Sequence, residues 1–138
     1  MLEKMTATKR ISFLIDSRLE CVSLVGAAIN ALCVKHGVDE MNSYQVQTAT
    51  IEAVNNAIIH AYENDSGHEV RVDCILSGES ICIEVLDHGK GMQKLPANKA
   101  PELDAESGRG WWIIRRWMDY VEYETKDGFN RISMVRNI

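Results

Sequence analysis

Long apolar runs are missing from this sequence of 138 residues, and none approaches the roughly 18–20 residues that a membrane-spanning helix needs. The charged N-terminus also lacks the apolar segment of a signal peptide, because Asp16, Arg18 and Glu20 interrupt the first apolar stretch. Internal repeats and low-complexity tracts are absent as well. We therefore expect a cytoplasmic protein without membrane contact.

An excess of positive charge is also absent, since the net charge is −5. Broad nucleic-acid binding needs a positive face that displaces counterions, so we expect no direct nucleic-acid partner. The apolar fraction of 46% and the charged fraction of 25% are ordinary for a globular protein. A chain of this length can bury a core of its own, and we expect a single domain over residues 1–138.

The cysteines form no C-x-x-C pair, and the four histidines are equally scattered. Paired spacings of that kind are what a structural zinc site requires, so we expect no such site. Each cysteine lies among apolar neighbours, which favours reduced thiols buried in helices or strands; they are Cys21, Cys33, Cys74 and Cys82.

Hydrophobic periodicity predicts three helices and five strands. Ser17 and Glu20 have the spacing of a capping box, which predicts a helix that Gly37 ends. A second helix is expected from Asn42 or Ser43 to about Tyr62, with a buried stripe of Val46, Ala49, Ala53, Ala57 and Ala61. Strands are expected at 10–15, 69–76, 81–86, 120–125 and 131–135, and a third helix at 111–118.

Short turns join consecutive strands, which implies mostly antiparallel pairing. We therefore predict an α/β two-layer sandwich of the α+β type, with a mixed, mostly antiparallel sheet covered on one face by about three helices. The window from Gly89 to Gly110 has little periodicity and holds four of the nine glycines and both prolines. A loop of that length is often a lid or a binding loop.

Glu52 and Asn56 lie four residues apart on the second helix, so they project from the same side. A carboxylate and a carboxamide there could hold a hydrated Mg²⁺ and orient a nucleophile. The segment alone favours a solvated pair on the flank of a helix.

Asp87, Gly89 and Gly91 follow a predicted strand directly. Alternate glycines let a backbone turn sharply and approach a ligand, and the aspartate can accept a hydrogen bond from an exocyclic amine. A plain turn is the other interpretation of this segment.

Gly108, Arg109 and Gly110 precede the third predicted helix. Glycines before a helix expose backbone N–H groups to an anion, and the helix dipole adds attraction. This is typical of phosphate binding, although a flexible loop end has the same composition.

The order of these segments resembles the Bergerat-fold, histidine-kinase-like ATPase superfamily. The closest similarity is to the bacterial anti-sigma-factor serine/threonine kinases, through E-A-V-x-N-A-I-x-H-x-Y at 52–62 and S-G-x-G with a short apolar helix and M-D at 107–119. The resemblance covers about residues 10–135 and implies the Bergerat ATP-binding fold.

The resemblance also implies roles for the site residues. Asn56 would coordinate Mg²⁺ bound to the phosphates of ATP, and Glu52 would act as general base or orient the attacking hydroxyl. Asp87 would bind the adenine amine, with Gly89 and Gly91 beneath the base. Gly108, Arg109 and Gly110 would contact the phosphates, and residues 92–107 would form the ATP lid.

The activity that the resemblance implies is a protein serine/threonine kinase. Its substrate would be a small anti-sigma-factor antagonist, and it would sequester a sigma factor or an equivalent regulator; homodimers are common in the family. An ATP-gated binding module without significant kinase activity is the alternative.

The sequence departs from the family pattern in its last strand, where a threonine is common and only Ser133 is available. Trp111 and Trp112 are bulky so close to a phosphate loop. We expect Trp111 to pack under the sheet, and the roles of Trp112, Arg115 and Arg116 stay open.

Overall fold

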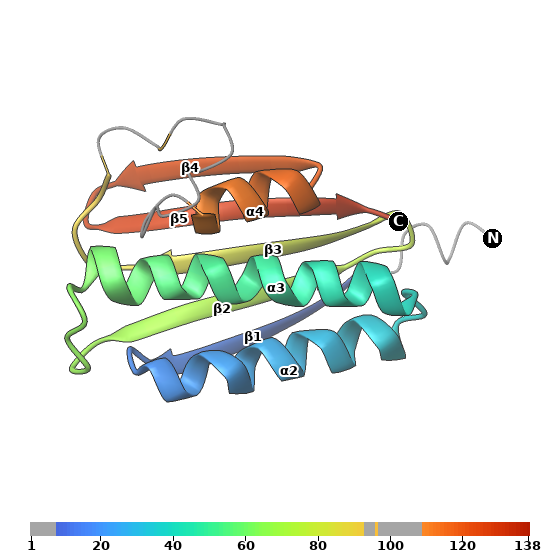
Figure 1. The fold of residues 1–138 in the computed structure, drawn as a ribbon, viewed down its shortest axis with the longest axis horizontal. Coiled ribbons are helices and arrows are strands. Elements are labelled where there is room, and N and C mark those ends of the chain that lie inside the picture. The colour runs from blue at the N-terminus through green and yellow to red at the C-terminus, as the bar shows by residue number, and fades with distance from the viewer. Residues whose placement is uncertain (1–7, 93–95, 97–108) are drawn as a thin grey trace.

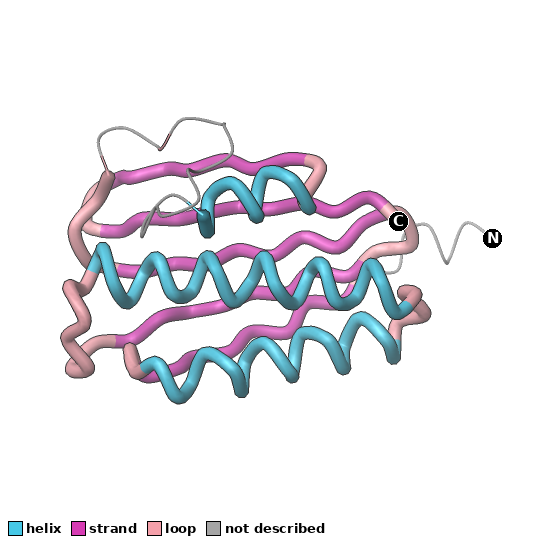
Figure 2. The backbone as a smooth tube through the Cα atoms, viewed as in Figure 1, coloured by secondary structure: helices cyan, strands magenta, loops and turns pink. Residues whose placement is uncertain are grey.

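Five antiparallel strands form one sheet, and the three α-helices of the described residues all cover the same face of it (Figures 1 and 2). The computed structural model describes residues 8–92, 96 and 109–138. The strand order is β1-β2-β3-β5-β4, which confirms the two-layer α+β sandwich. The elements are β1 (Lys9–Asp16), α2 (Leu19–Lys35), α3 (Glu40–Asn56), η1 (Ala57–Ala61), β2 (Glu69–Leu76), β3 (Ser80–Asp87), α4 (Arg109–Trp117), β4 (Tyr120–Lys126) and β5 (Phe129–Asn137).

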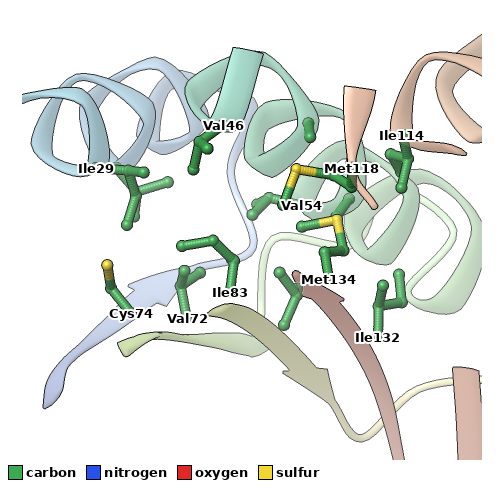
Figure 3. Packing of buried hydrophobic residues seen from close by; sticks show 14 of the residues in the cluster. Ile29, Val46, Val54, Val72, Cys74, Ile83, Ile114, Met118, Ile132 and Met134 are labelled. Atoms are coloured by element: carbon green, nitrogen blue, oxygen red, sulfur yellow. The ribbon is translucent and has the colours of Figure 1, made fainter. Parts of the chain in front are cut away.

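The core lies between the sheet and the helices. Along β3, inward residues such as Ile81 and Ile83 are fully buried and alternate with partly exposed ones, as a half-covered strand requires. Figure 3 shows Ile29 and Val46 from the helical layer above Val72 and Ile83 from the sheet. This single core holds the helices in fixed positions over the strands.

The N-termini of the first two helices differ from the sequence prediction. The capping box is wrong: Arg18 is the N-cap of α2, and the Ser17 hydroxyl instead donates to the backbone oxygen of Asp65 at 2.6 Å. Helix α3 begins earlier than predicted, because the side chain of Asp39 caps it by accepting from the backbone N–H of Asn42 at 2.7 Å.

The predicted apolar stripe on α3 is confirmed for its first four members, whereas Ala61 is only partly buried. The chain leaves the α-helical path after Asn56 and forms the π-helical turn η1. Turns of this type inside helices frequently mark functional sites.

The fold brings three termini to one end of the molecule. The C-terminal ends of α3 and β3 lie on the left in Figure 1, and the N-terminal end of α4 points toward that side. The segments that carried the three sequence motifs therefore converge there. None of the described helices has the length and apolar character needed to cross a membrane. All four cysteines are free thiols, and Cys33 and Cys74 are buried, whereas Cys21 and Cys82 are only partly buried.

Candidate nucleotide site

The start of α4 lies directly against Glu52 and Asn56 of α3. A Cβ atom built on Gly110 would lie 2.7 Å from Glu52 Oε2 and 3.6 Å from Asn56 Oδ1. Only glycine lets the backbone at position 110 come this close to Glu52 without displacing the Glu52 side chain. Residues more than 50 positions apart in the sequence are thus close together in space. Gly108 lies outside the described residues, and Arg109 is the first residue of α4.

The side-chain amide of Asn56 has a donor without a hydrogen-bond partner. Its nitrogen Nδ2 is buried and has no hydrogen-bond partner among the described residues. Leaving a buried donor unpaired costs about 1–3 kcal/mol, so an acceptor from a ligand would stabilise it. The side-chain oxygen of the same amide is of the type that Mg²⁺ prefers. The residues at this point therefore fit a metal–phosphate group.

Glu52 is half-buried beside this amide, and burial raises the pKa of its carboxyl group. A raised pKa makes a carboxylate a better proton acceptor near neutral pH. Among the described residues, no group of three or more His, Cys, Asp and Glu side chains could hold a metal ion. Any Mg²⁺ here would thus depend on few protein ligands, with phosphates and waters as the others.

Asp87 stands at the end of β3 and is only 6% exposed. Burial raises the pKa of its carboxyl group, and hydrogen bonds from Asn130 and Gly89 partly oppose that rise. Oδ1 accepts both bonds, from Asn130 Nδ2 at 2.7 Å and from the Gly89 backbone N–H at 2.9 Å. The carboxylate is therefore held in one orientation.

The two glycines after Asp87 allow the chain to pass close to its neighbours. A Cβ on Gly89 would collide with the backbone carbonyl of Ala61, and one on Gly91 would lie 2.7 Å from Thr125 Oγ1. The backbone N–H of Lys90 donates to the Ala61 oxygen at 2.9 Å. This segment is thus tied to the π-helical turn on one side and to β4 on the other.

A small cavity of about 20 Å³ connects the two halves of the site. It has room for about one water molecule, far less than a purine needs. Met92 and Tyr123 help to close it, and the Met92 backbone N–H donates to the Tyr123 hydroxyl at 2.9 Å. The other lining side chains that carry polar groups are Asn56, His60, Asp87 and Lys90.

Sequence reasoning missed Asn130 and Thr125. Asn130 lies opposite Asp87 in the β3–β5 register, and Thr125 lies opposite Asn130 in the β4–β5 register. The family pattern points to a hydroxyl in the last strand, for which Ser133 is the candidate in the sequence. Ser133 instead points to the other face of the sheet, where it donates to Glu84 Oε2 at 3.1 Å. The alternation of β5 with Ile132 and Met134 inward could have revealed Asn130, had the pairing with β3 been known.

The two tryptophans of α4 have different surroundings. Trp111 is buried, as expected, and meets Tyr123 edge-on with ring centroids 6.4 Å apart. Trp112 is partly buried, and the guanidinium of Arg116 lies 5.9 Å from its ring. The Arg115 guanidinium lies over Trp111 and donates to the backbone oxygen of Pro96 at 2.5 Å. In this structure Arg115 and Arg116 thus cover the tryptophans.

The chain matches known proteins over most of its length. The family model described as "Histidine kinase-like ATPase domain" matches residues 15–136. The "Anti-sigma F factor" of Thermoanaerobacter sp. is 32% identical over 128 residues, which are 89% of this chain and 87% of the relative. The chain therefore belongs to the histidine kinase-like ATPase domain family, as the sequence resemblance indicated. Membership of an ATPase domain family implies that it binds ATP.

Two further matches are shorter or more distant. The "Anti-sigma F factor" of Anoxybacillus flavithermus is 36% identical over 95 residues, 64% of this chain and 63% of that relative, so the match spans less than two thirds of the relative. The crystal structure of the RsbU and RsbW domains of a Mycobacterium tuberculosis protein has a TM-score of 0.70 at 17% identity. It covers 94% of this chain and 32% of that one, and it shows the shared fold.

Proposed function

We propose that this chain is an ATP-dependent serine/threonine protein kinase that acts as an anti-sigma factor. The observation that carries the proposal is the meeting of Glu52 and Gly110 with Asn56, which lines the same cavity as Asp87. A carboxylate, a carboxamide and a helix N-terminus there are suited to the phosphate end of a nucleotide. The buried carboxylate at the other end is suited to its base.

This geometry supports a binding role for each residue of the site. Asp87 accepts a hydrogen bond from the adenine amine, and Gly89 and Gly91 let the backbone pass near the base. Gly108, Arg109 and Gly110 offer N–H groups and positive charge to the phosphates at the N-terminus of α4. Asn56 holds Mg²⁺ through its side-chain oxygen, and that ion would neutralise negative charge on the phosphates.

Glu52 orients the hydroxyl of the substrate protein and takes up its proton. In the transfer, a bond forms between the hydroxyl oxygen and the γ-phosphorus, and the bond to the β–γ bridging oxygen breaks, so that ADP leaves. The raised pKa of Glu52 suits proton acceptance, and its contact with Gly110 sets its position. Positioning and charge neutralisation supply most of the rate in such reactions.

The partners are proposed from the relatives, whose printed name is "Anti-sigma F factor". That name supports a sigma factor as the captured partner. The phosphorylated substrate would then be a small antagonist that competes for the chain. A protein with these partners would act in the cytoplasm.

The test is phosphate transfer from labelled ATP with Mg²⁺ to a purified antagonist protein from the same genome. We expect label on a serine or threonine with the wild-type chain, and no label with Glu52→Ala. The matched control is Glu79→Ala, an exposed turn residue away from the site. Equal labelling by wild type and Glu52→Ala would refute the role of Glu52, and no labelling by wild type with any antagonist tried would refute the kinase activity.

The small cavity favours a second candidate, an ATP-gated binding module without significant transfer. A cavity of about 20 Å³ is too small for adenine, so its lining has to move before the base can enter. ATP would therefore favour a conformation different from this one, which is the condition for a ligand to shift partner affinity. This candidate requires ATP binding that is lost in Asp87→Asn, sigma-factor binding that depends on ATP, and no phosphate transfer.

A further inference from the structure

The carboxylate of Asp87 offers a nucleotide only half of its hydrogen-bonding capacity. Oδ1 accepts from Asn130 Nδ2 at 2.7 Å and from the Gly89 N–H at 2.9 Å, which fills both of its lone pairs. No described residue donates to Oδ2. Since Asp87 lines the cavity and is only 6% exposed, Oδ2 is the acceptor left for a base.

The bond from Asn130 has a fixed direction. The Thr125 hydroxyl donates to Asn130 Oδ1 at 2.7 Å, so the oxygen of the amide faces Thr125 and its nitrogen faces Asp87. The two N–H groups of Nδ2 are then used, one by Asp87 and the other by the Gly89 carbonyl at 3.0 Å. Asn130 is 3% exposed and has no donor left for a ligand. It acts on a nucleotide only through Asp87.

This arrangement distinguishes between purines. Adenine presents one exocyclic amine, which a single carboxylate oxygen can accept. Guanine presents two parallel N–H groups, at N1 and at the 2-amine, and a carboxylate binds both only when both of its oxygens are available. We infer that Asn130 is a specificity-determining residue: by occupying Oδ1 it leaves Asp87 a single acceptor, which selects 6-aminopurine nucleotides over guanine nucleotides. This inference rests on the proposed contact between Asp87 and the base.

The experiment measures dissociation constants of ATP and GTP with Mg²⁺ for the full chain, by calorimetry. We expect wild type to prefer ATP. Asn130→Ala frees Asp87 Oδ1 for a second donor from the base, so it should lower the ATP-to-GTP preference about tenfold, the usual effect of one hydrogen bond to a charged group. Thr125→Val keeps the shape of the side chain but frees the amide to turn, so it should change the preference in the same direction by a smaller factor.

Ser133→Ala is the matched control, because it removes a hydroxyl from the same strand on the opposite face of the sheet. Its ATP-to-GTP preference should equal that of wild type. A merely structural role for Asn130 would weaken both nucleotides equally and leave the preference unchanged.

Two results would overturn the inference, and they differ. If Asp87→Asn loses ATP binding while folded Asn130→Ala keeps the wild-type preference, the base contact stands and the role of Asn130 is wrong. If Asp87→Asn binds ATP like wild type, the base contact itself fails, and the inference fails with it. Should Asn130→Ala not fold, Thr125→Val decides, since an unchanged preference there contradicts the arrangement.

Discussion

Substitution of Gly110 by alanine separates the position of Glu52 from the stability of the fold. The new Cβ would lie 2.7 Å from Glu52 Oε2, so the carboxylate would have to retreat by about 0.7 Å to reach ordinary contact distance. The atom it meets is the far end of a flexible side chain, and Gly110 lies in the first turn of α4. The fold should therefore accept the methyl group.

The expected magnitudes follow from these contacts. The free energy of unfolding should change by no more than about 0.5 kcal/mol, because alanine favours a helix and only one side chain moves. Phosphate transfer should fall about 100-fold, the usual consequence of misplacing a reacting group by about 1 Å. The two measurements are thermal unfolding and the initial rate of antagonist labelling at saturating ATP.

Gly67→Ala is the matched control, since its Cβ would meet only Asp65 Oδ1 at an ordinary 3.5 Å. It should leave both stability and transfer unchanged. A wild-type transfer rate in Gly110→Ala would refute the idea that this glycine sets the position of Glu52. A large loss of stability would refute the claim that the fold tolerates the methyl group.

Three further outcomes are expected. Gly89→Ala should lower the free energy of unfolding by about 1–3 kcal/mol, measured in urea, because its Cβ collides with the rigid carbonyl of Ala61; unchanged stability would contradict that contact. Burial raises the pKa of Glu52, so the folded chain keeps the proton on this carboxyl group to a higher pH than the unfolded chain does. Glu52 therefore makes the free energy of unfolding fall as pH rises from the pKa of the unfolded chain to that of the folded chain. Glu52→Gln should remove that slope in melts taken across pH, and an identical slope would contradict the raised pKa. Burial would raise the pKa of Asp73, but hydrogen bonds from Ser12 and two arginines outweigh this effect, so the pKa is lowered in the folded chain. The ionised Asp73 therefore stabilises the fold above the pKa of the unfolded chain, and this stabilisation is lost as pH falls through the pKa of the folded chain. Asp73→Asn should therefore destabilise the chain at neutral pH but not in acid, and an equal loss at both would contradict this assignment.

Much of the fold could be predicted because its periodic patterns are local. The patterns in β2 and β3 and the apolar stripe of α3 predicted these three elements to within a few residues. Helix N-termini were less predictable, since Ser17 has two possible uses. Its hydroxyl could cap α2 or bond to the loop at Asp65, and only the tertiary structure selects the second.

Contacts in the site could be predicted where they follow from spacing along one helix, and not where they follow from the pairing of distant strands. Glu52 and Asn56 share a helix face, so their proximity follows from helical geometry. The contact of Asp87 with Asn130 depends on β5 lying beside β3, a pairing between strands more than 40 residues apart. Nothing local in the sequence fixes that pairing.

The central claim is that one nucleotide spans the site from Asp87 to Gly110. A crystal structure of the chain with a non-hydrolysable ATP analogue and Mg²⁺ tests it most directly. We expect the adenine amine at Asp87 Oδ2, the metal at the side-chain oxygen of Asn56 and the phosphates at the N-terminus of α4, with Met92 or Tyr123 displaced. A nucleotide bound elsewhere on the chain, or none at saturating concentration, would contradict the claim.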